Sequence, residues 1–325
     1  MKPKVYITRI IPEEALNVIA EHCEYEVWPR ETQAVPRPVL EEKIRAADGL
    51  YSMLTDRIDK PLLDMAPCLK AVSNMAVGFD NIDVDECTAR GILVCNTPGV
   101  LTETTADLAW ALLMAAARRI TESERFLREN KWTTWSPMLL TGIDVYGATL
   151  GIVGFGRIGQ AVARRAKGFG MRVLYYNRTA KPDLEASMGV QRATLDELLK
   201  ASDFVSVHVP LTDETRGMIG PRELALMKPT AVLVNAARGQ VVDEQALCRA
   251  LKEKQIFAAG LDVFQEEPLP PDSPLRELDN VVLLPHIGSA SVATRTKMAI
   301  MAARHLIQAL RGERPEHIVN PEVLA

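Results

Sequence analysis

Short apolar segments alternate with helical patterns along most of the chain, and this alternation constrains the fold more than any other feature. Six such segments lie between residues 149 and 286, each apolar enough to be buried on both faces of a sheet. They are TLGIVGFG (149–156), VLYYN (173–177), FVSVHVP (204–210), AVLVNAA (231–237), AAGLDVF (258–264) and VVLLPH (281–286). Strands that alternate with helices predict an α/β domain built on a doubly wound parallel sheet.

The first hundred residues repeat the alternation and predict a second Rossmann-like parallel sheet. Its expected strands include VYIT (5–8), GLYSML (49–54), LKAVSNM (69–75) and ILVCN (92–96). An amphipathic helix over 290–312 follows the last strand, and we expect it to cross back to the first domain. The predicted domains are residues 1–99 together with 289–325, and residues 100–288. A length of 325 residues agrees with two domains of roughly 150 residues each.

A helical pattern that begins at Thr102 joins the two predicted domains. A capping pattern of Thr102 and Glu103 opens it, and its apolar stripe runs through Leu108 and Leu112. Two interpretations stay open for this stripe. The helix is either an ordinary buried helix of its own chain or a surface that packs against a second subunit.

The overall composition excludes several classes of protein. Thirty-eight Lys and Arg against forty-two Asp and Glu give a net charge of −4, so no broad positive field favours nucleic acid. The apolar run over 108–117 is far shorter than the ~20 residues of a membrane span, and no signal peptide is visible. The cysteines are odd in number and never spaced C-x-x-C, which indicates core thiols in a reducing, cytoplasmic setting without metal: Cys23, Cys68, Cys87, Cys95 and Cys248.

The segment Gly154-Phe155-Gly156-Arg157-Ile158-Gly159 matches the dinucleotide-binding pattern G-x-G-x-x-G. It follows a buried strand pattern directly and opens a helical pattern, as phosphate binding at a helix N-terminus requires. Gly154 is expected in the tight turn, Gly156 beside a pyrophosphate, and Gly159 where helix and strand approach closely. A structural glycine turn is the alternative.

The residues after the second strand of that domain bear on the choice of cofactor. An acidic residue that would bind the ribose 2′-hydroxyl of NAD is replaced by Asn177, followed by Arg178, Thr179 and Lys181. No Asp or Glu occurs between Gly159 and Asp183. Because these groups suit a 2′-phosphate, NADP(H) is predicted in preference to NAD(H). The alternative is that Arg178 is only a solvated loop charge.

Three polar residues stand at or just past the ends of late strands, where open parallel sheets place their ligands. They are Arg238 in NAARGQVVDEQAL, Glu267 in GLDVFQEEP and His286 in PHIGSAS. Each taken alone is more often structural: an Arg before Gly is often a turn, and a single His is often a satisfied core residue.

Together with the surrounding segments, these residues resemble the D-isomer-specific 2-hydroxyacid dehydrogenase family over nearly the whole chain. The matching segments are VGFDNID (77–83), TLGIVGFGRIG (149–159), HVPLTDETRGMI (208–219), NAARGQVVDEQAL (235–247), GLDVF-x-x-EP (260–268) and PHIGSAS (285–291). Within the family, the NRT segment and KWTTWSP are most similar to the glyoxylate and hydroxypyruvate reductases. The resemblance implies two Rossmann-like domains, a discontinuous substrate-binding domain and an NAD(P)-binding domain.

The resemblance also implies a reaction and three catalytic residues. A reduced nicotinamide would transfer a hydride to the carbonyl carbon of a small 2-oxo acid, and His286 would protonate the oxygen. Glu267 would stabilise and orient the imidazolium, and Arg238 would hold the substrate carboxylate. The choice of Glu267 over Glu266 depends on the family pattern, in which the catalytic residue directly precedes the proline.

The remaining contacts come from the resemblance in the same way. For the substrate it implies the N–H groups of Val77 and Gly78 and the side chains Leu54, Asn74, Trp135, Arg238 and Ser289. For the cofactor it implies Gly154, Phe155, Gly156, Arg157, Ile158, Asn177, Arg178, Thr179, Pro210, Thr215, Ala236, Ala237, Asp262 and Gly288. The alternative for Val77 and Gly78 is a joining turn. For Trp135 the alternatives are a pocket wall, supplied by a partner subunit of a homodimer, and a core aromatic.

Three other functions remain as alternatives. A short phosphoglycerate dehydrogenase or a D-lactate dehydrogenase would usually have an acidic residue in place of Asn177. A dinucleotide-sensing corepressor would use the same fold to bind protein partners, but long flanking tails are expected of it, and only PEHIVNPEVLA follows the last helical pattern.

Overall fold

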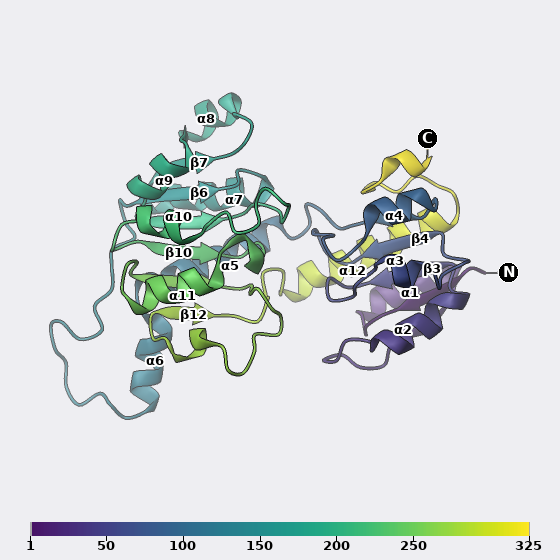
Figure 1. Cartoon of the computed structure of the whole chain (residues 1–325), viewed down its shortest axis with the longest axis horizontal. Helices are drawn as coiled ribbons and strands as arrows, with labels where there is room; N and C mark the ends of the chain where they lie inside the picture. The colour runs from purple at the N-terminus through teal and green to yellow at the C-terminus, as the bar shows by residue number, and fades with distance from the viewer. Residues whose placement is uncertain (1, 325) are drawn as a thin grey trace. The chain divides into compact units, whose positions relative to one another are not determined.

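The computed structural model describes residues 2–324, and it divides the chain into two compact units (Figure 1). Of the described residues, the first unit contains 2–101 and 290–324, and the second contains 102–289. These boundaries lie one or two residues from those expected from the sequence.

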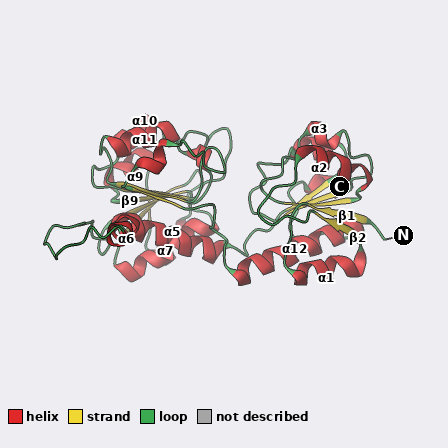
Figure 2. Ribbon diagram, turned by 90° about the horizontal axis from the view of Figure 1, so that it is seen from below, coloured by secondary structure: helices red, strands yellow, loops and turns green. Residues whose placement is uncertain are grey.

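The first unit is built on a parallel five-stranded sheet of order β2-β1-β3-β4-β5. Its strands are β1 (Lys4–Ile7), β2 (Glu24–Val27), β3 (Gly49–Ser52), β4 (Ala71–Asn74) and β5 (Leu93–Cys95). Helices α1 (Glu13–His22) and α12 (Val292–Leu310) cover one face, and α2 (Arg37–Lys43) and α3 (Lys60–Leu63) cover the other (Figure 2). Helix α4 (Val84–Ala89) belongs to the same side as α3, since Cys87 packs with Leu62 and Leu63.

The C-terminal helix α12 completes this unit, as the sequence predicts. Its backbone carbonyls accept hydrogen bonds from two strands: Tyr51 Oη donates to Ala299 O at 3.1 Å, and Ser73 Oγ donates to Ala302 O at 2.8 Å. The two hydroxyls lie on neighbouring strands and point to one face of the sheet. The helix is therefore fixed in register as well as covered by apolar contact.

The second unit has a parallel seven-stranded sheet of order β12-β11-β10-β9-β6-β7-β8. The strands are β6 (Thr149–Val153), β7 (Arg172–Tyr176), β8 (Gln191–Arg192), β9 (Phe204–Val207), β10 (Val232–Asn235), β11 (Ala258–Leu261) and β12 (Val281–Leu283). All six apolar segments contain a strand, and the seventh strand, β8, is too short to give a pattern. Because the chain order reverses between β6 and β9, the carboxyl ends of these strands form the switch point where such sheets bind ligands.

Helices cover both faces of this sheet (Figure 2). On one face lie α5 (Thr102–Ala117) and α7 (Arg157–Ala166), and on the other α9 (Leu195–Ala201), α10 (Pro221–Leu226) and α11 (Glu244–Lys252). The apolar residues of α5, including Leu112 and Leu113, are buried in the core of this unit. The interpretation as a buried helix of its own chain therefore holds for Leu112, whereas Leu108 of the predicted stripe is only half-buried, and packing of the stripe against a second subunit stays a prediction.

One segment of the second unit leaves several large apolar side chains exposed. Helix α6 (Ile120–Arg128) buries none of its residues, and the loop over 129–147, which we call the arm, follows it (Figure 1). The arm exposes Trp132 at 56%, Trp135 at 76% and Tyr146 at 82%. Side chains of this size are normally buried, so the arm has the composition of an interface.

The cysteines differ in how deeply they are buried. Cys23, Cys87 and Cys95 are buried thiols, but the expectation of a core position is wrong for Cys68, which is exposed. Among residues 2–324, no helix combines the length and apolar character needed to cross a bilayer.

Candidate active site

The glycine-rich loop at the switch point has the geometry that the sequence predicts. Gly154 has a left-handed φ of +98°, and a Cβ there would lie 2.7 Å from the backbone of His208. A Cβ on Gly159 would lie 2.2 Å from Gly154 O, because α7 packs directly against the turn. Gly156 is the N-cap of α7, and a Cβ there would meet no described atom within 4 Å. This open space beside a helix N-terminus fits a dinucleotide pyrophosphate.

The segment after β7 is tied to the glycine loop by Asn177. Its Oδ1 accepts a hydrogen bond from Phe155 N–H at 3.3 Å, and its Nδ2 donates to Thr179 O at 2.9 Å. Arg192, from the short strand β8, donates to Asn177 O at 3.3 Å and to Arg178 O at 3.1 Å. Arg178 itself is exposed. Hydrogen bonds from Arg192 and Asn177 therefore fix the backbone of this segment, while the Arg178 guanidinium stays available to bind a ligand.

A carboxylate that the sequence did not point to lies near this basic segment. The Thr212 hydroxyl donates to Glu214 Oε2 at 2.7 Å, and this hydrogen bond is the largest cause that lowers the pKa of Glu214 below its ordinary value. The positive charge of Arg178 lowers this pKa further. The prediction of a basic segment without acidic residues therefore holds for 160–182, but Glu214 enters from a loop more than thirty residues later.

Glu267 and His286 form a hydrogen-bonded pair at the ends of β11 and β12. His286 Nδ1 lies 2.7 Å from Glu267 Oε2, and Phe264 N–H donates to Glu267 Oε1 at 3.0 Å. Both carboxylate oxygens are thereby used. The pairing singles out Glu267 and not Glu266 as the partner of the histidine.

The charges around Glu267 show that the third residue of the predicted trio is close. Burial raises the pKa of Glu267, but the hydrogen bond and charge of His286, the Phe264 N–H and the charge of Arg238 together hold it below its ordinary value. The structure therefore brings Arg238, Glu267 and His286 to one region of the second unit.

The position of Arg238 depends on the glycine that follows it. A Cβ on Gly239 would lie 1.9 Å from the carbonyl of Phe264, so the turn after Arg238 packs directly against the segment that holds Glu267. Asn235, which is buried, stabilises this turn: its Nδ2 donates to Arg238 O at 2.9 Å and its Oδ1 accepts from Ala237 N–H at 3.1 Å. The sequence pattern assigns Asn235 no role, because nothing distinguishes it from other strand residues.

His286 is held in an unusual backbone conformation, with a φ of 53°. Left-handed backbone is disfavoured for a side chain such as histidine, so its surroundings must enforce it. The Asp262 carboxylate does so by accepting hydrogen bonds at 2.7 Å from both Ile287 N–H and Gly288 N–H. Burial raises the pKa of Asp262, although these N–H groups and the His286 charge oppose the rise.

In the first unit, the loop after β4 exposes unpaired backbone donors. Among the described residues, none accepts a hydrogen bond from the N–H groups of Val77 or Gly78, and both residues are half-buried. Asn74 is fully buried, and its Nδ2 donates to Gly78 O at 3.0 Å. Asn74 thus contacts the loop from within the protein.

The comparisons with known proteins agree with this arrangement. The family model described as D-isomer specific 2-hydroxyacid dehydrogenase, NAD binding domain, matches residues 110–288. A glyoxylate reductase of Korarchaeum cryptofilum is 57% identical over 325 residues, which cover 100% of this chain and 98% of that protein. The chain belongs to the D-isomer-specific 2-hydroxyacid dehydrogenase family. As in that family, it is an NAD(P)-dependent oxidoreductase that uses a nicotinamide dinucleotide.

Other members of the family are similar over the full length. A glyoxylate reductase of Thermococcus gammatolerans is 57% identical over 328 residues, which cover 100% of this chain and 98% of that protein. The solved structure of an NADPH-dependent glyoxylate/hydroxypyruvate reductase of Sinorhizobium meliloti, in complex with NADP and malonate, has a TM-score of 0.86 and 35% identity. The match covers 98% of this chain and 97% of that one.

Among the other predicted contact residues of this dehydrogenase, Thr215 serves local structure, and Trp135, Leu54 and Ser289 differ in exposure. Thr215 Oγ1 donates to Pro210 O at 2.6 Å and accepts from Thr212 N–H at 2.8 Å, so its hydroxyl closes its own loop. Trp135 is exposed, which makes the core-aromatic alternative wrong. Leu54 and Ser289 are half-buried, in the first and second units respectively.

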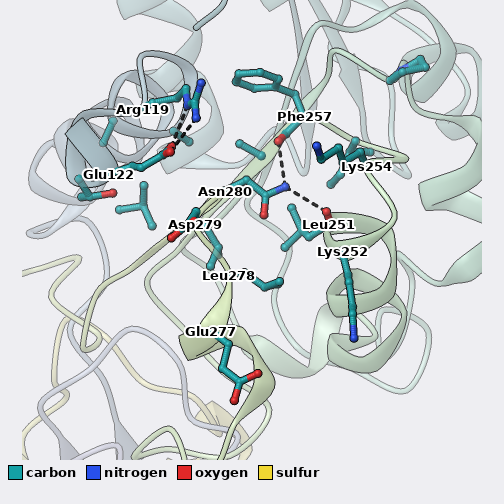
Figure 3. Close-up of a pocket in the computed structure, with 18 residues that line it drawn as sticks. Arg119, Glu122, Leu251, Lys252, Lys254, Phe257, Glu277, Leu278, Asp279 and Asn280 are labelled. Atoms are coloured by element: carbon teal, nitrogen blue, oxygen red, sulfur yellow. Dashed lines mark hydrogen bonds and ion pairs between the residues drawn. The ribbon is translucent and has the colours of Figure 1, made fainter. Parts of the chain in front are cut away.

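A cavity of about 510 Å³ in the second unit is separate from this site (Figure 3). It lies at the amino ends of β10–β12, the sheet edge opposite the glycine loop, and its lining includes Arg119, Phe257 and Asn280. Arg119 is paired with Glu122, and Asn280 donates to Leu251 O and Phe257 O. Among residues 2–324, no cluster of metal-binding side chains accompanies either place.

Proposed function

We propose that this dehydrogenase reduces glyoxylate and hydroxypyruvate to glycolate and D-glycerate with NADPH, and that His286 is the proton donor. The observation that supports this most is the pairing of His286 with Glu267 beside the charge of Arg238. Similar proteins that are named glyoxylate reductase support the choice of substrate.

The bound nicotinamide would supply a hydride to the substrate's carbonyl carbon, and the chain's own residues would handle the proton. Glu267 occupies His286 Nδ1, which leaves Nε2 without a partner among the described residues. A protonated Nε2–H can therefore donate to a carbonyl oxygen, and the nearby carboxylate stabilises the imidazolium before transfer. In the opposite direction the neutral ring would take the proton back.

The substrate carboxylate needs donors of a different kind. Arg238 offers a planar guanidinium, which binds a carboxylate through two parallel N–H groups. In the first unit, the N–H groups of Val77 and Gly78 offer unpaired donors. A small acid such as glyoxylate presents almost nothing except its carbonyl and carboxylate, so these donors would provide most of its binding.

For the cofactor, we propose NADP(H) over NAD(H). The groups that would hold a 2′-phosphate are the exposed Arg178 and Thr179 and the half-buried Lys181, on a backbone fixed by Asn177 and Arg192. The Glu214 carboxylate lowers this positive potential, because its negative charge interacts with the positive charge of Arg178. The preference for NADP(H) should therefore be clear, but NAD(H) should still be used at higher concentrations.

We also propose that the chain is a homodimer in which a second copy covers the arm. The exposed Trp132, Trp135 and Tyr146 need an apolar partner, and the chain itself provides none among its described residues. Trp135 would then wall the substrate pocket of the partner subunit. Sedimentation analysis of the wild type and of a Trp132→Ala, Trp135→Ala double variant tests the dimer. A monomeric wild type would contradict it.

A substrate panel tests the proposed reaction. Glyoxylate, hydroxypyruvate, pyruvate and 3-phosphohydroxypyruvate are each assayed with NADPH and with NADH by loss of reduced-cofactor absorbance. The highest kcat/KM is expected for glyoxylate or hydroxypyruvate with NADPH. A preference for 3-phosphohydroxypyruvate or pyruvate would instead identify a phosphoglycerate or D-lactate dehydrogenase. Absence of turnover on all four acids would favour the corepressor-like alternative.

A further inference from the structure

Three consecutive carbonyls of the loop after β4 are each hydrogen-bonded from the protein side. Thr97 N–H donates to Ala76 O at 2.8 Å, Asn96 Nδ2 donates to Val77 O at 2.8 Å, and Asn74 Nδ2 donates to Gly78 O at 3.0 Å. The three donors come from the carboxyl ends of the neighbouring strands β4 and β5. The whole loop is thus oriented through its carbonyl oxygens.

The orientation of each carbonyl sets the direction of the next N–H group. In a trans peptide, C=O and N–H are fixed in one plane and point in opposite directions. Anchoring the carbonyls of Ala76, Val77 and Gly78 therefore turns three N–H groups, those of Val77, Gly78 and Phe79, away from the anchoring donors. None of the three has an acceptor among the described residues. Successive free N–H groups of this kind form an anion-binding nest.

We propose that Asn96 is a positioning residue for the substrate carboxylate, and that Phe79 N–H is a third donor to it. This inference rests on the proposed function for the identity of the anion. Asn96 holds the central peptide of the loop, between Val77 and Gly78, and only 9% of the residue is exposed. It acts through Val77 O, so it orients the nest without touching the substrate.

Asn96 is a better site for a test substitution than Asn74, because its side chain makes fewer other contacts. Asn74 also contacts Asn81 Oδ1 at 3.2 Å and accepts from Ser52 Oγ at 3.1 Å, so its replacement would disturb a wider network. The Asn96 side chain donates to Val77 O alone among the described residues. Its backbone carbonyl, which His305 contacts at 3.2 Å, is unaffected by a side-chain substitution.

The test compares Asn96→Asp with a matched control, Asn320→Asp. The substitution at 96 replaces the amide donor by a carboxylate that repels Val77 O, at nearly constant volume. Asn320 is also buried in the same unit, where its amide binds Thr88 Oγ1, Ile92 O and Val94 N–H. The control therefore removes buried hydrogen bonds of a similar kind without altering the loop. Asn96→Ala serves as a second variant if Asn96→Asp does not fold.

Two measurements on the full chain separate this inference from the proposed function. In steady-state assays, Asn96→Asp should raise KM for glyoxylate at least about tenfold with little change in NADPH affinity, whereas Asn320→Asp should lower only the melting temperature. In a titration of the isotope-labelled NADP⁺ complex with oxamate, a carboxylate that cannot be reduced, the amide signals of Val77, Gly78 and Phe79 should shift together in the wild type and in Asn320→Asp.

The outcomes are distinct. Loss of the three amide responses in Asn96→Asp supports the inference, even if no 2-oxo acid is turned over and the proposed reaction fails. The inference is overturned if Phe79 does not respond in the wild type. It is also overturned if Asn96→Asp responds like the wild type, or if Asn320→Asp weakens oxamate binding equally.

Discussion

Replacing Gly156 by alanine should damage cofactor binding without damaging the protein. A Cβ at this position meets no described atom within 4 Å, so no packing penalty is expected. Alanine is a poorer N-cap than glycine, but it also lowers the entropy of the unfolded chain, so stability should change by less than about 1 kcal/mol. The same methyl group would stand where a pyrophosphate approaches the backbone. Loss of one or two charge-assisted N–H contacts is worth about 2–3 kcal/mol, or roughly a 30- to 150-fold weaker NADPH affinity.

Two other glycines of the same unit provide the comparison. Gly159→Ala would place a Cβ 2.2 Å from Gly154 O, far inside ordinary contact, so α7 must shift and stability should fall by about 1–3 kcal/mol along with NADPH affinity. Gly168→Ala also meets no described atom within 4 Å, and it lies beyond the glycine loop, so neither property should change.

The assay is NADPH fluorescence titration combined with urea unfolding of the apoprotein for all three variants. The expected pattern is loss of affinity alone for Gly156→Ala, loss of both properties for Gly159→Ala and loss of neither for Gly168→Ala. Unchanged NADPH affinity in Gly156→Ala would refute the argument that the cofactor's phosphates pack against this residue.

Three further predictions concern separate parts of the second unit. Asn177→Asp combined with Arg178→Gln should reverse the ratio of kcat/KM for NADPH and NADH; equal use of both cofactors by the parent enzyme would show that these residues do not select. Arg238→Lys should lower kcat/KM for the 2-oxo acid with little effect on NADPH affinity, because lysine cannot bind a carboxylate bidentately; a selective loss of NADPH binding would assign Arg238 to the cofactor. Burial lowers the pKa of His208 to about 4, so the unfolded chain takes up this proton first as pH falls below about 6.5. Urea unfolding between pH 7 and 4.5 should therefore show an acid-dependent loss of at most about 3 kcal/mol that His208→Gln removes, and an equal loss in the variant would contradict the assignment.

The parts of the structure that the sequence predicted are those set by local pattern. Buried parallel strands are continuous apolar runs, so each of the six segments over 149–286 contained a strand, whereas β8, with two exposed residues, had no such signal. The three glycines of the loop could be assigned because their order along a strand, turn and helix reflects local sterics. The position of Thr102–Ala117 could not be decided, since an apolar helix face has the same sequence whether its own chain or another covers it.

The parts that the sequence missed depend on contacts between distant segments. Asn96 binds the loop after a neighbouring strand, and Glu214 approaches Arg178 from a loop more than thirty residues later. A lone polar residue has no periodicity to reveal such a partner. Cys68 was expected in the core because free cysteines are usually buried, but its position on an exposed loop depends on tertiary packing. The choice between Glu266 and Glu267 required the observed 2.7 Å approach to His286.

The most direct test of the proposed reaction is a single-turnover measurement on His286→Gln. Glutamine keeps a side chain of similar polarity but cannot serve as an acid, so the variant should bind NADPH normally and oxidise it with glyoxylate at least about a hundredfold more slowly than the wild type. A variant that binds NADPH and turns over at nearly the wild-type rate would contradict the assignment of His286 as the proton donor.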